Sequence, residues 1–143
     1  MNISGDSTNI RNISWSEFEN RMNCEFGKKF SRKGSKIDEL FFNVESQINF
    51  GEENELSDSK ALEYLQTMHS MSGELCVITD YCYERNCGPF VLDAEKINFF
   101  VEKFQVTYGE AFYATDIIIV SFSEKMIWVL FHEGICWLSK GEL

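Results

Sequence analysis

The sequence has little of the chemistry from which enzyme and metal sites are built. Among its 143 residues there are only two histidines, and the five cysteines are irregularly spaced. Cys82 and Cys87 come nearest to a metal-binding pair, but no second pair of Cys or His lies at the spacing of a zinc site. The nine glycines are scattered, so the chain has no glycine-rich loop that could hold a phosphate group. From these absences we expect no enzyme, no cofactor and no metal ion.

Long apolar runs are also absent. No run approaches the length of a membrane-spanning helix. Residues 1–6 are polar, and the apolar stretch that a secretory signal has near its start is missing. An odd number of cysteines without such a signal is typical of a reducing compartment. These features predict a cytoplasmic protein that does not bind a membrane.

Acidic residues outnumber basic ones, and the excess is unevenly distributed. The formal net charge is −10 and the isoelectric point is about 4.6. Residues 1–36 have seven basic and four acidic side chains, whereas residues 37–143 have six basic and nineteen acidic ones. Nucleic acids and anionic membranes are recognised by Lys and Arg, so they repel such a surface, and a basic partner is favoured. The alternative interpretation is that the charge serves only solubility.

One basic stretch runs against this trend. Residues 28–36 include five basic side chains and an aromatic one, Phe30, which is a combination found in nucleic-acid contacts. The acidic remainder of the chain would oppose a polyanion. We therefore interpret the stretch as a solvated loop and expect no nucleic-acid partner.

Apolar periodicity predicts an α+β fold. Spacings of three and four residues, with capping residues such as Ser14 and Ser57, predict helices over residues 15–24, 36–48, 58–71 and 94–107. Apolar β-type runs predict strands over residues 75–81, 90–92, 116–122, 126–132 and 135–138. The strand at 116–122 is almost entirely apolar, so we expect it in the middle of the sheet with both faces covered. The chain is predicted to be a single domain, residues 1–143, with N-terminal helices packed on a small, mainly antiparallel C-terminal sheet, a β-meander.

Two groups of acidic residues lie outside the apolar helix seams and are candidate partner-binding sites. The first occupies one loop and consists of Glu52, Glu53, Glu55 and Asp58. The second mixes carboxylates with tyrosines at the end of a predicted strand and consists of Asp80, Tyr81, Tyr83 and Glu84. Aromatic anchors supply contact area while carboxylates pair with Lys and Arg, so both groups suit a basic protein. Either group is also compatible with ordinary solvated surface.

The last part of the chain carries a resemblance to a known family. The residues concerned are the predicted helix 94–107, the link 109–113, the strand 116–122, and the segment 127–134 before Cys136-Trp137-Leu138. In these residues the chain resembles immunity proteins of bacterial contact-dependent growth inhibition and related polymorphic toxin systems. The resemblance implies a protein that binds one cognate toxin domain and blocks it. Many such toxins are nucleases with basic substrate grooves, and an acidic inhibitor would suit them. The family has no fixed binding motif, so no functional residue is carried over.

Three hypotheses follow from the sequence. The first is an immunity protein that neutralises a cognate toxin domain by electrostatic capture and steric occlusion. The second is an acidic adaptor or regulatory subunit of a cytosolic complex, without catalysis. The third is a small enzyme that uses Cys82 or Cys87 with His69 or His132 as a base. The toxin's activity, the binding surface, the choice between its active site and an exosite, and the oligomeric state are left open.

Overall fold

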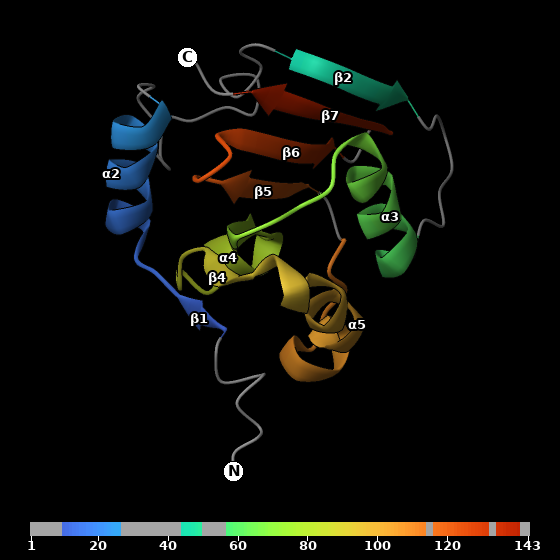
Figure 1. Ribbon diagram of the computed structural model, residues 1–143. Helices are drawn as coiled ribbons and strands as arrows, with labels where there is room; N and C mark the ends of the chain where they lie inside the picture. Colours follow the sequence, from blue (N-terminus) through green and yellow to red (C-terminus); the bar gives the residue numbers. More distant parts are fainter. Residues whose placement is uncertain (1–9, 27–43, 50–56, 114–115, 132–133, 141–143) are drawn as a thin grey trace.

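The computed structural model describes residues 10–26, 44–49, 57–113, 116–131 and 134–140 (Figure 1). Their strands form one seven-stranded sheet in the order β1-β4-β3-β5-β6-β7-β2, in which every neighbouring pair is antiparallel. The strands are β1 (Arg11–Asn12), β2 (Val44–Asn49), β3 (Glu74–Ile78), β4 (Phe90–Asp93), β5 (Ile117–Ser121), β6 (Met126–Phe131) and β7 (Ile135–Lys140). The helices are α2 (Trp15–Phe26), α3 (Asp58–Met68), α4 (Asp80–Glu84) and α5 (Ile97–Tyr108), with a 3₁₀ turn, η2 (Ala94–Lys96), before α5. The predicted α+β class with an antiparallel sheet is confirmed.

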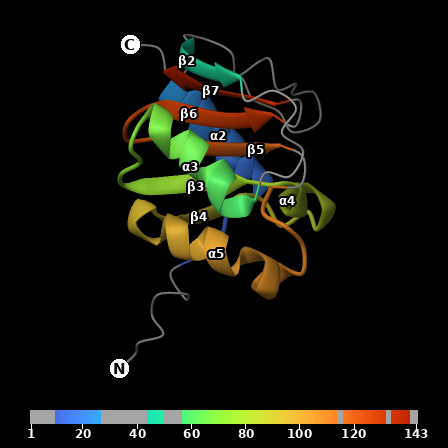
Figure 2. The ribbon, with the colours of Figure 1, turned by 90° about the vertical axis from the view of Figure 1, so that its right-hand side faces the viewer.

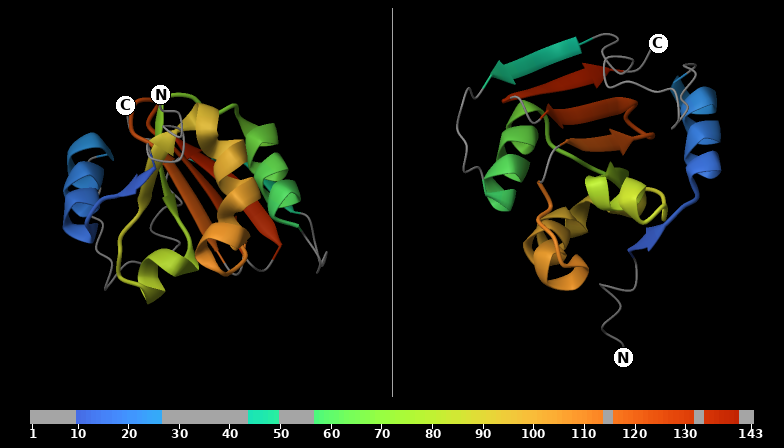
Figure 3. Two further views of the ribbon diagram at one scale, coloured as in Figure 1. Left: turned by 90° about the horizontal axis from the view of Figure 1, so that it is seen from below. Right: turned by 180° about the vertical axis from the view of Figure 1, so that it is seen from behind.

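Helices cover both faces of the sheet. Helix α2 lies against one face, and α3 and α5 lie against the other (Figure 2, Figure 3). The short helix α4 follows the end of β3 and does not belong to either layer. In the part of the chain that the structure describes, no helix is long and apolar enough to cross a membrane.

The C-terminal strands form the predicted meander. Strands β5, β6 and β7 are consecutive in the chain and adjacent in the sheet. All five residues of β5 are buried, because this strand lies at the centre of the sheet with helices on both faces. The prediction that residues 116–122 run through the middle of the sheet is therefore confirmed.

Helix α5 fixes an aromatic core against β4. Its apolar seam buries Phe100 and Phe104, whose rings meet Phe90 of β4 edge-on at centroid distances of 5.1 and 5.8 Å. Such edge-to-face contacts add to the burial of apolar area. The helix ends at Gly109, whose φ of 84° is the left-handed conformation that glycine adopts without strain. Val106 stands outside the seam and is 86% exposed.

The predicted helix over residues 36–48 is wrong at its C-terminal end. Residues 44–49 form β2, which pairs with β7 from Val44 opposite Ser139 to Asn49 opposite Ile135. The spacing of Val44 and Ile48 fits a helix and a strand equally well, and pairing with β7 decides between them. Residues 36–43 lie outside the described part of the chain.

Two further boundaries differ from the sequence prediction. The strand expected over residues 75–81 ends at Ile78, because Thr79 is the N-cap of α4 and the chain turns there into a helix. The sheet is not confined to the C-terminal half either, since β1 and β2 provide its two outermost strands. These edge strands pair only with residues far away in the sequence, which local periodicity cannot reveal.

Candidate protein-binding site at the acidic corner

Helix α4 carries the second predicted acidic group, and its position is set by Cys82. The Thr79 N–H donates to Sγ of Cys82 (3.5 Å), and the Cys82 N–H donates to the carbonyl of Thr79 (3.1 Å), so the chain turns into α4 directly after β3. Cys82 is the residue of α4 that is fully buried. Asp80, Tyr81, Tyr83 and Glu84 therefore lie on one short helix rather than at the end of a strand.

The two tyrosines of α4 are held in fixed orientations by other aromatic rings. The ring of Tyr83 stacks on Trp15 of α2 at a centroid distance of 4.8 Å and an interplanar angle of 22°, and 44% of Tyr83 stays exposed. The ring of Tyr81 stacks on Phe90 at 5.9 Å and contacts Tyr108 at 4.9 Å. Rings that are already ordered lose little conformational entropy when a partner covers them.

A third acidic side chain joins this region from the segment after α5. The pKa of the Glu110 carboxyl is raised, first by partial burial and then by the nearby carboxylates of Glu84 and Asp80, while the Arg85 guanidinium acts in the opposite direction. Like charges raise each other's pKa only when they lie close together. We use the name acidic corner for Asp80, Tyr81, Tyr83, Glu84 and Glu110. Sequence reasoning missed Glu110, because no local pattern connects it with α4.

A close backbone crossing positions the acidic corner. The Ile13 N–H donates to the carbonyl of Pro89 (3.1 Å), and the Asn12 side chain donates to the carbonyl of Gly88 (3.0 Å). These bonds bring the start of α2 across the loop that follows α4. The crossing places Trp15 against Tyr83, so the corner depends on a contact between segments about 70 residues apart.

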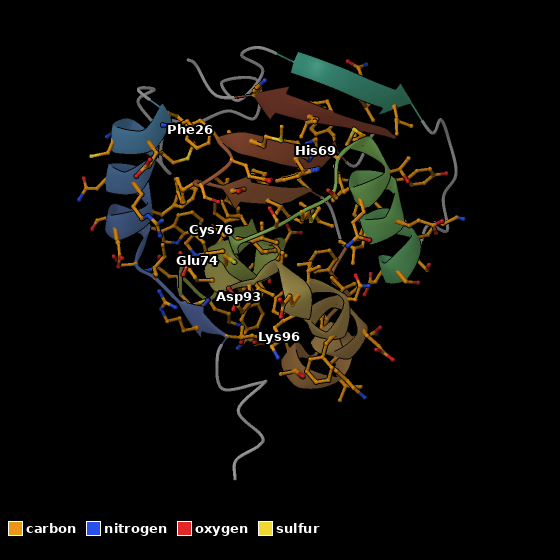
Figure 4. All side chains as sticks on the ribbon, viewed as in Figure 1. Phe26, His69, Glu74, Cys76, Asp93 and Lys96 are labelled. Carbon is orange, nitrogen blue, oxygen red and sulfur yellow. The ribbon has the colours of Figure 1, made fainter. Side chains whose placement is uncertain are left out.

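Several ion pairs lie away from the acidic corner. Arg11 and Arg21 both reach Glu74, at 3.7 and 3.4 Å. Glu74 begins β3 opposite Asp93 in β4 (Figure 4), whereas α4 follows the other end of β3. Two further pairs join Lys60 to Glu63 and Lys125 to Glu25. At the α4 end, the Arg85 guanidinium lies 5.0 Å from the centre of the Tyr81 ring and acts on Glu110, so cations lie near both ends of β3.

Of the first predicted acidic group, only Asp58 lies in the described part of the chain, and its carboxylate binds backbone. The Phe112 N–H donates to Oδ2 (2.9 Å) and the Tyr113 N–H donates to Oδ1 (3.1 Å), which ties the segment after α5 to the start of α3. Ser57 caps the same helix by accepting from the Lys60 N–H (3.2 Å). The structure does not bring Asp58 into the acidic corner. Glu52, Glu53 and Glu55 lie outside the described residues.

Replacing Asp58 with asparagine is expected to lower the free energy of unfolding by roughly 1–3 kcal/mol. An amide nitrogen cannot accept a hydrogen bond, so one of the two backbone N–H groups loses its acceptor. Chemical denaturation measures the loss. Glu63→Gln, with the same change of charge on the same helix, should cost less than about 0.5 kcal/mol. Equal losses in the two variants would mean that the Asp58 carboxylate is not an anchor.

Burial disfavours the thiolate form of both cysteines near the corner. Burial raises the pKa of Cys82 to about 12, and burial also raises the pKa of Cys87, so both thiols stay protonated at neutral pH. Nδ1 of His69 lies 2.7 Å from the carbonyl oxygen of Ser70, at the end of α3 (Figure 4). His132 is outside the described residues. The described geometry therefore gives the thiol-enzyme hypothesis no observation in its favour.

In the described ranges, no group of three or more His, Cys, Asp and Glu side chains is placed to hold a metal ion. No protein-family model, no curated protein and no solved structure matches this chain.

Proposed function

We propose that the protein is an immunity protein that binds a cognate bacterial toxin domain, a basic nuclease, and neutralises it. The observation that supports this most is the acidic corner, where the helix that carries Asp80, Glu84 and two ordered tyrosine rings lies close to Glu110. Carboxylates of this kind pair with Lys and Arg, and tyrosines are preferred anchors of protein interfaces. The resemblance of the C-terminal segments to immunity proteins points in the same direction.

Inhibition proceeds in two stages in this proposal. The net charge of −10 attracts a basic domain over a distance and orients it during the encounter. Tyr81 and Tyr83 then pack against the toxin while the carboxylates pair with cations around its substrate groove. A nuclease groove binds phosphates through such cations, so a protein that occupies them excludes the nucleic acid.

An acidic adaptor or regulatory subunit is the second candidate. The half-exposed Tyr83 beside carboxylates would serve an adaptor equally well. The neighbouring reading frame separates the two candidates, because immunity genes lie directly downstream of the gene for their toxin. Co-purification with the product of that upstream gene, with loss of its toxicity, supports the immunity function. Co-purification without any effect on toxicity supports the adaptor.

Association with the partner is expected to slow as salt is added. Raising NaCl from about 50 to about 300 mM should lower the association rate constant by roughly tenfold, because the Debye length becomes shorter than the distance over which the charges act. The dissociation rate should change much less. Surface plasmon resonance over a salt series measures both rates. An association rate that does not depend on salt would remove electrostatic capture from the mechanism.

A further inference from the structure

A groove separate from the acidic corner runs between α3 and α5. Its volume is about 840 Å³, close to the upper end of the range for ligand pockets. Leu62 of α3 and Val101 of α5 form its apolar floor, and both side chains are buried. We call it the α3–α5 groove. Both helices lie on the face of the sheet opposite α2 (Figure 2, Figure 3).

Hydrogen bonds near both ends hold the two walls of the α3–α5 groove together. Near one end, the Gln66 side chain of α3 donates to the Asn98 side chain of α5 (3.1 Å). Near the other end, the Asp58 carboxylate binds the backbone of the segment after α5. A groove that is already formed requires no opening step before a partner enters it.

The charged residues that line the groove are all acidic. Asp58, Glu63 and Glu102 line it, and no Lys, Arg or His is among its lining residues within the described part of the chain. Glu63 projects from α3 and Glu102 from α5, so the two exposed carboxylates stand on opposite walls. Lys60 reaches Glu63 at 3.6 Å, but both side chains are more than half exposed, and such a pair is weak enough to be exchanged for another cation.

Two exposed apolar side chains lie next to Glu102 on α5, on the solvent side of the groove lining. Phe99 is 41% exposed and Val106 is 86% exposed. They precede and follow Glu102 by three and four residues, so all three lie on one side of the helix. A partner that reaches Glu102 therefore also covers two apolar side chains, which adds area to the charge contacts.

We infer that the α3–α5 groove is a docking site for a basic amphipathic helix of a partner protein. Charge complementarity carries this inference, because the walls are acidic and the floor and outer flank are apolar. Apolar residues of the incoming helix contact Phe99, Val106 and the floor. Its Lys or Arg stems lie along the apolar surface while their cationic ends reach Glu63 and Glu102. The inference rests on the proposed function only in taking the partner to be a basic protein.

A synthetic Leu/Lys amphipathic peptide of about 14 residues, which gives four helical turns, tests the groove directly. Titrated into the ¹⁵N-labelled full-length protein, it should shift amide resonances of α3 and α5, including Gln66, Glu102 and Gln105. Glu63→Gln/Glu102→Gln should weaken binding about tenfold. Val106→Ser should weaken it several-fold, and it cannot disturb the core because Val106 is exposed. The control Glu17→Gln/Glu19→Gln makes the same charge change on α2, beyond the opposite face of the sheet, and should leave the affinity unchanged.

Three results would overturn the docking site. One is a peptide-induced shift confined to residues outside α3 and α5. Another is an equal loss of affinity in the groove variant and the α2 control. A third is that spermine, a small polycation without apolar groups, produces the same shifts at the same concentration, which would assign the groove to a polyamine.

The outcome for the groove is separable from the outcome for the proposed function. If Glu63→Gln/Glu102→Gln binds the peptide as tightly as the wild type while the toxin is still neutralised, the docking site is wrong and the immunity function stands. If the peptide binds in the groove but the product of the upstream gene does not bind, the immunity function is wrong and the docking site stands.

Discussion

Replacing Gly88 with alanine is expected to destabilise the protein by about 3 kcal/mol or more. A Cβ atom at this position would lie 1.9 Å from the carbonyl oxygen of Ile13, and the φ of Gly88 is +83°, where alanine is strained. Rotating a side chain cannot relieve the clash, because the Ile13 oxygen belongs to the backbone. It cannot relieve the strain either, because φ is a backbone angle. The crossing of residues 12–13 over residues 88–89 would have to open, and the stacking of Trp15 on Tyr83 would be lost with it.

A second glycine provides a matched control for this prediction. Gly109 has nearly the same φ, +84°, but a Cβ atom there meets nothing within 4 Å. Gly109→Ala should therefore cost only the backbone strain, about 1 kcal/mol. Urea denaturation gives both free energies of unfolding, and a loss of about 3 kcal/mol lowers the melting temperature by roughly 10 °C in a chain of this length. Similar losses in the two variants would mean that the close crossing at Gly88 does not exist.

Reversing two charges of the acidic corner is expected to abolish most of the affinity for the toxin. Glu84→Lys/Glu110→Lys places two cations where the partner's own Lys and Arg side chains must approach. Like charges brought together at an interface cost several kcal/mol, so the dissociation constant should rise at least about 100-fold. Isothermal titration calorimetry with the isolated toxin domain measures this change.

The control for the charge reversal uses the other end of β4. Asp93→Lys/Glu95→Lys makes the same change in net charge at exposed positions, but Asp93 lies opposite Glu74, away from α4. The affinity of this control variant for the toxin should stay within about threefold of the wild type. The small loss comes from the lower net negative charge, which weakens the long-range attraction. If both double variants lose affinity equally, only the net charge matters and the acidic corner is not the binding surface.

Local sequence signals were sufficient for the elements that carry their own caps and periodicity. Helix α3 begins after Ser57 as predicted, because the Ser57 hydroxyl accepts a hydrogen bond from the Lys60 N–H. Strand β5 was recognisable because burial on both faces requires an apolar run. Strand β2 was mistaken for a helix, because what decides its conformation is pairing with β7, about 90 residues away in the chain. Such pairing cannot be recognised from the spacing of apolar residues.

The candidate site was predictable only in its composition. A carboxylate-and-tyrosine group over residues 80–84 is visible in the sequence, but the contribution of Glu110 and the stacking of Trp15 on Tyr83 arise from long-range packing. Asp58 illustrates the opposite case. Its carboxylate looks like surface charge in the sequence, yet it accepts hydrogen bonds from the backbone of Phe112 and Tyr113. A sequence lists the possible donors and acceptors, and only the fold decides which of them meet.

Co-expression with the product of the gene directly upstream tests the toxin-neutralising function most directly. The two proteins should co-purify as a stable complex, and cells that make the upstream product should grow only when this protein is present. Glu84→Lys/Glu110→Lys should lose both the complex and the protection, while Asp93→Lys/Glu95→Lys should keep both. Growth that does not depend on this protein, or protection that survives the reversal at the acidic corner, would show that neutralisation through this surface is not its function.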